Sequence, residues 1–440
     1  MTSNAMTSTA MTSDAMTSTA IPSIEDFQSE ARAFLTANCK RREANEARKW
    51  GEGSDRVALF EEKKAETEAR DVAAAKAFRQ KLFDAGFGWI TGPTELGGRG
   101  LPAAYQRAFN EEASQCAIPN MSLFDIGLGM VAPTFLAHGT EEAKQKFLRP
   151  MWRGEIVGCQ LFSEPGAGSD LASLQTKAER DGDEWVITGQ KVWTTGAHLA
   201  DVGEVICRTD PNLPKHKGLT GFIVDMKAPG VEVRPLRQMT GGSSFNEVFF
   251  NEVRVPDSYR LGDVNQGWTV ALTTLMNERA SIGGGANRDR GSAMDVSFLA
   301  QMLHSMGLGE SKVHRDELMK IFCDMEVARY SGMRAMAKIK AGQLPGPEMS
   351  TGKLAIATTM KNVSAWVSSV LGPRMIADSG QWGTYGWGDF VLGAPGMRIA
   401  GGSDEVMRNI LGERVLGLPK DTGIDSVTPF KDLKVGTQKA

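Results

Sequence analysis

The sequence predicts a mostly helical α+β protein in which helices come first, strands follow and helices return. Two observations carry this prediction. Apolar residues recur at helical spacing on both sides of a central stretch, and that stretch consists of short β-rich runs separated by Gly, Pro and Asn. We expect a tail over 1–20, an N-terminal helical domain over 21–155, a small antiparallel β domain over 156–265, and a C-terminal helical bundle with its tail over 266–440.

The N-terminal part combines a repetitive tail with helical sequence. The first twenty residues repeat the pattern MTS-x-A, and no basic residue precedes Arg32. This polar composition is typical of a disordered tail and does not fit a signal or transit peptide. From Ile24 onward, apolar residues recur every three or four positions, which predicts helices in two stretches: IEDFQSEARAFLTANCKRREANEARKW and RDVAAAKAFRQKLFDAGF.

The central and C-terminal parts differ in the spacing of their apolar residues. DEWVITGQKVWTTGA contains two β-rich runs around Thr188 and Gly189, which predicts a hairpin turn between them. Further β-rich runs follow at short spacing: GFIVDM, VEVRPL and NEVFFNEVRVP. From Gly267 the helical period returns in three stretches: WTVALTTLMNERAS, DELMKIFCDMEVARYSGMRAMAKI and STGKLAIATTMKNVSAWVSSVL. We expect any functional site at the junctions of these domains.

Composition limits the classes of function. The chain has 440 residues, 41% of them hydrophobic, which is enough for a sizeable core. Its 50 basic and 53 acidic residues give a net charge of -3, so no global attraction to nucleic acid or to an anionic membrane is expected. The five cysteines form no CxxC pattern, and no apolar run is long enough to span a bilayer. These features predict a soluble protein of a reducing, cytoplasmic compartment without a zinc site.

A glycine-rich stretch, CQLFSEPGAGSDLASLQT, is the sharpest local feature. Gly166 and Gly168 flank Ala167, so the backbone can approach a ligand closely and present its N–H groups, and Ser169 adds a hydroxyl. Such a loop is able to hold a phosphate, although the same residues are also typical of an ordinary tight turn. The stretch is not a GxGxxG fingerprint and lies in no strand-helix alternation, so a Rossmann domain is not predicted.

A second motif, GQKVWTTGA, contains an aromatic residue beside a hydroxyl. Trp193 and Thr195 are two residues apart, so both are expected on one face of a strand. A flat aromatic side chain beside a hydroxyl suits one face of an isoalloxazine ring. The alternative is that Trp193 packs in the core of the β domain.

Together these motifs resemble the acyl-CoA dehydrogenase family. SEPGAGSD is followed by GxKxWxT, then by VRVP and by a terminal GGSDEVMRNILGERVLG, and the resemblance extends from Ile24 to Pro419. It implies an N-terminal helical domain, a central β domain and a C-terminal four-helix bundle, with FAD between the last two. It also implies an enzyme, an oxidoreductase acting on an acyl-CoA thioester.

The resemblance assigns roles to individual residues. Eight positions match family residues that contact FAD: Phe162, Ser163, Gly168, Ser169, Trp193, Thr195, Ser403 and Glu405. Ser169 and Arg279 match positions that contact the substrate. The alternative for Ser403 is a helix N-cap, because a serine followed by acidic residues satisfies free N–H groups in a first helical turn.

The catalytic base needs a separate argument. Many relatives place a glutamate two residues before the Ser of the terminal motif, but this chain has Gly401 there, which carries no side chain. Other relatives supply the carboxylate from the first helix of the bundle, immediately before an arginine. Glu278 precedes Arg279 at that place, and its helical neighbours Leu275 and Ile282 are apolar. We therefore predict Glu278 as the base; the alternative is a surface Glu-Arg pair.

The implied reaction is FAD-dependent dehydrogenation of an acyl-CoA thioester to the trans-2-enoyl-CoA, as in fatty acid β-oxidation. The expected electron acceptor is an electron-transfer flavoprotein, and the expected assembly is a homodimer or homotetramer, with a hetero-oligomer as an alternative. Two other functions remain open: an acyl-CoA oxidase, and a base-deficient subunit motivated by Gly401. HSMGLGESKVHRDELMK lacks the family's Arg-x-x-Phe-Gly, which in relatives reaches the FAD of a neighbouring subunit.

Overall fold

The computed structural model describes residues 21–42, 49–59, 64–284, 294–340, 346–420 and 426–434, with the side chains of 279–284 and 339–340 excepted. The MTS-x-A tail lies outside these residues. The chain divides into two compact units, one built from its beginning to Arg41 together with Trp89–Ile118, and the other from Arg42–Gly88 and Pro119–Ala440. Each unit is described by itself.

The first unit is a pair of helices, α1 (Ile24–Asn38) and α3 (Ala103–Ala113), with strands β1 (Lys40–Arg41) and β2 (Cys116–Ala117) paired beside them. Ser23 caps α1 by accepting a hydrogen bond from the N–H of Asp26. The buried face of α1 consists of three residues at four-residue spacing: Phe27, Ala31 and Leu35. This spacing explains why the predicted first helix forms.

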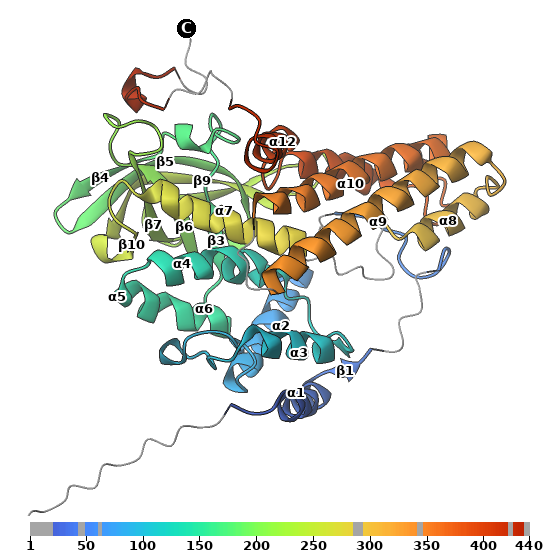
Figure 1. The fold of residues 1–440 in the computed structure, drawn as a ribbon, viewed down its shortest axis with the longest axis horizontal. Coiled ribbons are helices and arrows are strands. Elements are labelled where there is room, and N and C mark those ends of the chain that lie inside the picture. The colour runs from blue at the N-terminus through green and yellow to red at the C-terminus, as the bar shows by residue number, and fades with distance from the viewer. Residues whose placement is uncertain are drawn as a thin grey trace, which may run out of the picture. The chain divides into compact units, whose positions relative to one another are not determined.

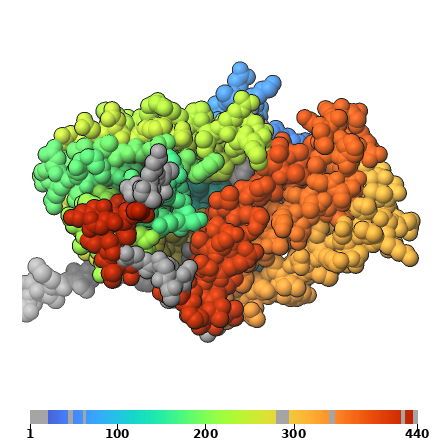
Figure 2. Space-filling model, turned by 90° about the horizontal axis from the view of Figure 1, so that it is seen from above, coloured from blue at the N-terminus to red at the C-terminus, as the bar shows by residue number. Residues whose placement is uncertain are grey.

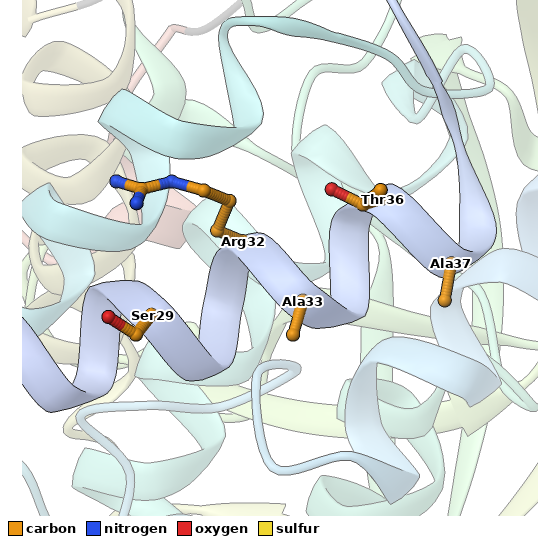
Figure 3. A pocket seen from close by; sticks show the side chains of 5 residues that line it. All are labelled: Ser29, Arg32, Ala33, Thr36 and Ala37. Carbon is orange, nitrogen blue, oxygen red and sulfur yellow. The ribbon is translucent and has the colours of Figure 1, made fainter.

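A hollow lies on the outer face of α1 (Figure 3). Its lining residues all belong to that one helix: Ser29, Arg32, Ala33, Thr36 and Ala37. The Arg32 guanidinium is bound to Glu112, with its Nη2 2.6 Å from Oε1. Because its one charged group is paired and its other residues are small, this hollow is not a candidate active site.

The second unit begins with helices. These are α2 (Ala65–Asp84), α4 (Ala132–His138), α5 (Glu141–Ala143) and α6 (Arg149–Arg153). Two π-helical turns, Gly127–Val131 and Lys144–Leu148, precede α4 and α6. A π-helical turn widens the helix and is often found at functional sites. The first of them packs against both β3 and α7, so it lies beside the elements that carry the site.

A mixed sheet follows in the second unit, and eight strands of the described residues form it: β3 (Gly158–Leu161), β4 (Lys177–Asp181), β5 (Glu184–Thr195), β6 (Val202–Arg208), β7 (Leu219–Asp225), β8 (Val231–Leu236), β9 (Phe245–Pro256) and β10 (Arg260–Leu261). Their order is β10-β7-β6-β4-β5-β9-β8, with β3 also paired to β6. The pairings of β3 and β4 with β6 are parallel and the others antiparallel, so the antiparallel prediction holds for most of the sheet.

The predicted hairpin at Thr188 and Gly189 is wrong. β5 is one strand of 12 residues that pairs with β9 on both sides of Gly189. The turn lies earlier, between β4 and β5, where Gly182 has a φ of 62°. Gly189 serves a different purpose, because a Cβ at that position would lie 2.7 Å from the Cα of Thr176. The glycine permits a close backbone approach within the sheet instead of a chain reversal.

The C-terminal helices are α7 (Gly267–Gly284), α8 (Val296–Ser305), α9 (Lys312–Lys340), α10 (Ser350–Leu371), α11 (Trp387–Gly393) and α12 (Asp404–Ile410). The long helices α9 and α10 lie alongside each other, whereas α7 packs on the sheet (Figure 1). Trp366, Trp387 and Phe390 are buried in the core of these helices. Within the described residues, no helix is both long enough and apolar enough to cross a membrane.

The last described segment, residues 426–434, returns to the β domain, on which it lies as a dark red patch in Figure 2. The N–H of Phe430 donates to the carbonyl oxygen of Leu213 at 2.9 Å. The Phe430 ring centroid lies 3.7 Å from the guanidinium carbon of Arg208. This segment therefore packs against Arg208, which in turn binds carbonyl oxygens of the loop that follows β3.

Candidate active site

A buried ion pair joins the two motifs singled out in the sequence. Lys191, on β5, is 0% exposed, and its Nζ lies 2.9 Å from Oε1 of Glu164, in the loop after β3. The same Nζ donates to the carbonyl oxygen of Phe162 at 3.0 Å. The N–H of Val192 donates to the carbonyl oxygen of Ser163 at 2.8 Å. Phe162 and Ser163 are thus fixed against the strand that carries Trp193.

Glu164 also closes the base of its own loop. Its Oε2 accepts from the N–H of Gln175 at 2.6 Å, and its Oε1 accepts from the N–H of Thr176 at 2.9 Å. Burial raises the pKa of this carboxyl, but the charge of Lys191 and the hydrogen bonds from Thr176 and Gln175 outweigh burial, so its pKa lies below the usual value. Glu164 is therefore ionised at neutral pH and holds both ends of the loop.

The tip of this loop presents the residues predicted to hold phosphate. Glu164 and Ala167 form a tight turn through reciprocal backbone hydrogen bonds of 3.0 and 3.1 Å. The tight-turn alternative is therefore correct for the backbone. Gly168 and Ser169 are exposed, and a Cβ on Gly168 would meet nothing within 4 Å. The turn and an open binding surface coexist in one loop.

Arg208 supports the loop from behind. Its Nη2 donates to the carbonyl oxygens of Ala172 at 2.6 Å and Leu174 at 3.2 Å, and its Nη1 to that of Lys215 at 2.7 Å. Burial lowers the pKa of this guanidinium to about 10, so it remains charged at neutral pH. Neither Arg208 nor the ion pair of Glu164 was predicted from the sequence; the one available signal was a charged residue within an otherwise β-rich run, at Lys191 and at Arg208.

Trp193 and Thr195 lie on an exposed face at the end of β5. The pairing with β9 shifts between Lys191 and Thr194, and Trp193 adopts a φ of 62° within this bulge. Its side chain is 58% exposed, Thr195 is also exposed, and Thr194 between them is buried. The core-packing alternative for Trp193 is wrong. Its ring and that of Phe245 meet in a T-shaped arrangement with 5.9 Å between their centroids, and most of the Trp193 side chain stays exposed.

Ser403 is the N-cap of α12. Its Oγ accepts a hydrogen bond from the N–H of Val406 at 3.3 Å, which confirms the capping interpretation. Asp404 is buried between Arg398, at 2.7 Å, and Lys353, at 3.5 Å, while Glu405 is exposed. α10 contacts both α12 and α7, so this turn and the helix of Glu278 share one neighbour. The assignment of Ser403 and Glu405 to FAD stays a prediction.

The backbone explains why position 401 carries glycine. Gly401 has a φ of 67° and Gly402 a φ of 89°, both in the left-handed region. A side chain in this region costs about 1–2 kcal/mol. A glutamate at this position would therefore strain the backbone, which is consistent with a catalytic base supplied from elsewhere.

We expect Gly401→Ala to lower the free energy of unfolding by about 1 kcal/mol because of this left-handed backbone. The matched control is Gly332→Ala, at a helical position of α9 where a Cβ meets nothing within 4 Å, and it should raise stability by up to about 1 kcal/mol. Denaturant unfolding of both variants measures the difference. Equal effects of the two substitutions would contradict the strain argument.

Glu278 lies on α7, which packs against β7, α4, α10 and the π-helical turn. Val270, Ala271 and Thr274 form the buried face of the helix, and Glu278 follows Thr274 by four residues, on the same side. The Glu278 side chain is partly buried. Arg279 is the next residue of α7, but its side chain lies outside the description.

Comparisons with known proteins define the class. The models of the acyl-CoA dehydrogenase N-terminal, middle and C-terminal domains match residues 52–155, 159–253 and 265–416. The chain belongs to the acyl-CoA dehydrogenase family. This membership confirms the predicted three-part fold and makes the chain a flavin-dependent oxidoreductase of acyl-CoA dehydrogenation.

Individual relatives agree with this assignment. The chain is 34% identical over 407 residues to acyl-CoA dehydrogenase IpdE1 of Mycobacterium tuberculosis, a match that covers 90% of this chain and 98% of that protein. It is 40% identical over 325 residues to acyl-CoA dehydrogenase FadE34 of the same organism, covering 73% of this chain but 44% of that protein. A solved structure titled Tcur3481-Tcur3483 steroid ACAD is 27% identical, with a TM-score of 0.68, and the match covers 90% of this chain and 98% of that one.

Members of the family are FAD-binding flavoproteins, and the residues present fit this cofactor. The exposed ring of Trp193 beside Thr195 offers a flat surface with a hydroxyl, which suits an isoalloxazine ring. The open loop at Gly168 and Ser169 offers backbone N–H groups and a hydroxyl, which suit phosphate. The ion pair of Lys191 and Glu164 connects these two surfaces, because one partner lies on β5 and the other in the loop after β3.

Proposed function

We propose that this chain converts an acyl-CoA thioester to its trans-2-enoyl-CoA with Glu278 as the base. One observation carries the proposal. Glu278 on α7 is partly buried, whereas the alternative base position is occupied by Gly401, whose backbone lies in the left-handed region. The Glu278 carboxylate takes the α-proton, the β-hydrogen leaves as hydride, and the carbon–carbon double bond forms from the electrons of the α C–H bond. When bound, FAD supplies the acceptor for that hydride.

The other predicted residues act by binding and orientation. Trp193 and Thr195, together with Phe162 and Ser163, would hold the ring system of FAD. Gly168 and Ser169 would bind its pyrophosphate, and Ser169 and Arg279 would also contact the substrate. Ser403 and Glu405 would contact the cofactor from the N-terminus of α12. Holding the reacting atoms in place is itself a large part of such a rate enhancement.

For the substrate, we infer an acyl-CoA whose acyl group is bulky. The support is the likeness to the steroid ACAD structure, which extends over 90% of this chain. A steroid acyl-CoA thioester is the specific candidate, and straight fatty acyl groups of β-oxidation are the alternative. The test is anaerobic bleaching of the flavin by a thioester panel. Faster bleaching by the bulky group supports the inference, and faster bleaching by a straight chain contradicts it.

An oligomer is supported by α9. Four apolar side chains lie on one exposed face of this helix: Met319, Phe322, Tyr330 and Met333. The buried residues Leu318 and Ile321 lie on a different side, in the helical core. We propose that further subunits, of the same kind or of a related kind, cover this face. Sedimentation of the purified chain should give a dimer or tetramer, and a monomer would leave the hetero-oligomer as the alternative.

The electron acceptor and the compartment stay proposals. By likeness to the family we expect an electron-transfer flavoprotein as acceptor, and oxygen consumption without an added acceptor would instead identify an oxidase. Cys159, Cys207 and Cys323 form no disulfide, which supports the proposal of a reducing, cytoplasmic compartment.

A further inference from the structure

A glutamate is completely buried beneath the helix that carries Glu278. Glu204, on β6, is 0% exposed. Its neighbours Val205 and Cys207 belong to the core on the other side of the sheet, so Glu204 faces α7. Its Oε1 lies 2.6 Å from Oγ1 of Thr274, while its Oε2 has no hydrogen-bond partner among the described residues. A carboxyl in this position needs an explanation, because burying an unpaired charge is costly.

The contact with Thr274 is the first of three in a row. The Oγ1 of Thr274 lies 2.9 Å from the Oγ1 of Thr134 on α4. Thr134 in turn donates to the carbonyl oxygen of Met130 at 2.9 Å, in the π-helical turn. Thr134 and Thr274 are both 0% exposed. The row thus connects the sheet, α7, α4 and the π-helical turn without access to water.

Counting protons along the row favours a protonated Glu204. The Met130 carbonyl cannot donate, so Thr134 donates its one proton there. Thr274 also has one proton, and its Oγ1 can donate it to Glu204, to Thr134 or to the carbonyl oxygen of Val270. The two hydroxyl protons therefore cannot serve all three contacts of the row, and a proton on Glu204 supplies the third. A protonated carboxyl completes all three hydrogen bonds in one direction, whereas a carboxylate leaves one contact without a proton.

The surrounding charges agree with this count. Burial raises the pKa of Glu204 to about 8, although a hydrogen bond donated by Thr274 to the ionised carboxylate lowers it in part. His138 is a titratable group of α4 that also contacts α7, since its Nε2 lies 2.8 Å from Oγ1 of Thr273. Burial lowers the pKa of His138, so it is neutral at pH 7 and offers no positive charge to a carboxylate.

We propose that Glu204 is a positioning residue that, in its protonated form, heads a directional hydrogen-bond chain through Thr274 and Thr134 to the Met130 carbonyl and so fixes α7. The proposal rests on the proposed function, because the helix it fixes carries Glu278 one turn beyond Thr274. A base must sit within hydrogen-bond reach of the α-carbon, and a displacement of about 1 Å can cost up to a hundredfold in rate. Glu204 itself touches neither substrate nor cofactor in this account.

The test compares Glu204→Gln with Glu204→Leu in the holoenzyme. Gln keeps a donor toward Thr274 and cannot ionise, so the rate of flavin reduction should stay within about twofold of the wild-type rate and should not decline toward about pH 9. Leu removes the donor, so that rate should fall about tenfold while substrate affinity changes little. In the wild type, the decline should follow the ionisation of Glu204, with a midpoint near its pKa of about 8.

Infrared spectroscopy gives a readout that does not depend on turnover. A protonated carboxyl band should be present at about pH 7 in the wild type, be missing in Glu204→Gln and disappear as the pH rises through about 8. Absence of this band at neutral pH, or a Gln variant as slow as the Leu variant, would overturn the proposal. A wrong assignment of Glu278 as the base would give a different result. Glu278→Gln would then stay active, while the infrared band of Glu204 would be unchanged.

Discussion

Glu278→Gln is expected to lower the turnover of acyl-CoA by about 10³-fold, within the range of roughly 10² to 10⁴ that a general base contributes. The substitution keeps the size of the side chain and removes only its ability to accept the α-proton. FAD should stay bound, because its candidate surfaces lie on β5, on the loop after β3 and on α12, not on α7. Steady-state turnover with an artificial electron acceptor, beside the flavin absorbance of the same sample, measures both effects.

The matched control for this variant is Glu317→Gln. Glu317 is an exposed glutamate of α9, and its replacement should leave turnover unchanged. Near-normal turnover in Glu278→Gln would eliminate the assigned base. A loss of flavin together with activity would instead show that the residue supports the fold.

Lys191→Met is expected to lower the free energy of unfolding by about 3–5 kcal/mol, the usual cost of breaking a buried ion pair on one side. The variant leaves the Glu164 carboxylate 8% exposed and without its cation, and it releases the carbonyl oxygen of Phe162. Because this loop and β5 both belong to the candidate FAD site, weaker flavin binding should accompany the loss. Denaturant unfolding and flavin retention on a desalting column measure the two effects.

Lys177→Met is the control for Lys191→Met, since Lys177 forms an exposed pair with Glu179 at 2.7 Å on neighbouring β4, with side chains 52% and 65% exposed. Such a surface pair contributes about 0–1 kcal/mol. The pH dependence adds a second check. The pKa of Glu164 is depressed in the folded state, so its stabilisation is present above its unfolded pKa and is lost as pH falls through the lower, folded value. Lys191→Met should lose most of this acid sensitivity; similar losses of stability in the two variants would contradict the buried-pair argument.

The sequence was sufficient for the order of the domains and for the motifs, because both depend on local patterns. Helical periods before 155 and after 266 predicted the helices, and SEPGAGSD and GQKVWTTGA identified two segments that the structure joins. The family followed from the order of four such motifs. The precise domain boundaries stay predictions, since the structure divides the chain along spatial contacts instead of along its sequence.

Features that depend on tertiary contacts were not predictable. Gly189 resembles a turn residue, but its role comes from Thr176 of another segment, which no local pattern reveals. The exposure of Trp193 results from a bulge that is set by the register with β9. Glu204 is one acidic residue in a strand of the sequence, and its burial becomes visible only when α7 packs over β6.

The central claim is that this chain by itself carries a complete dehydrogenase site with Glu278 as its base. The most direct test is the anaerobic flavin absorbance of the purified protein, titrated with bulky and straight-chain acyl-CoA thioesters, for the wild type and Glu278→Gln. We expect at least one thioester to bleach the wild-type flavin and none to bleach the variant at a comparable rate. Equal bleaching in both forms, or a bound flavin that no thioester bleaches in either form, would contradict the claim, and the second result would favour a base-deficient subunit.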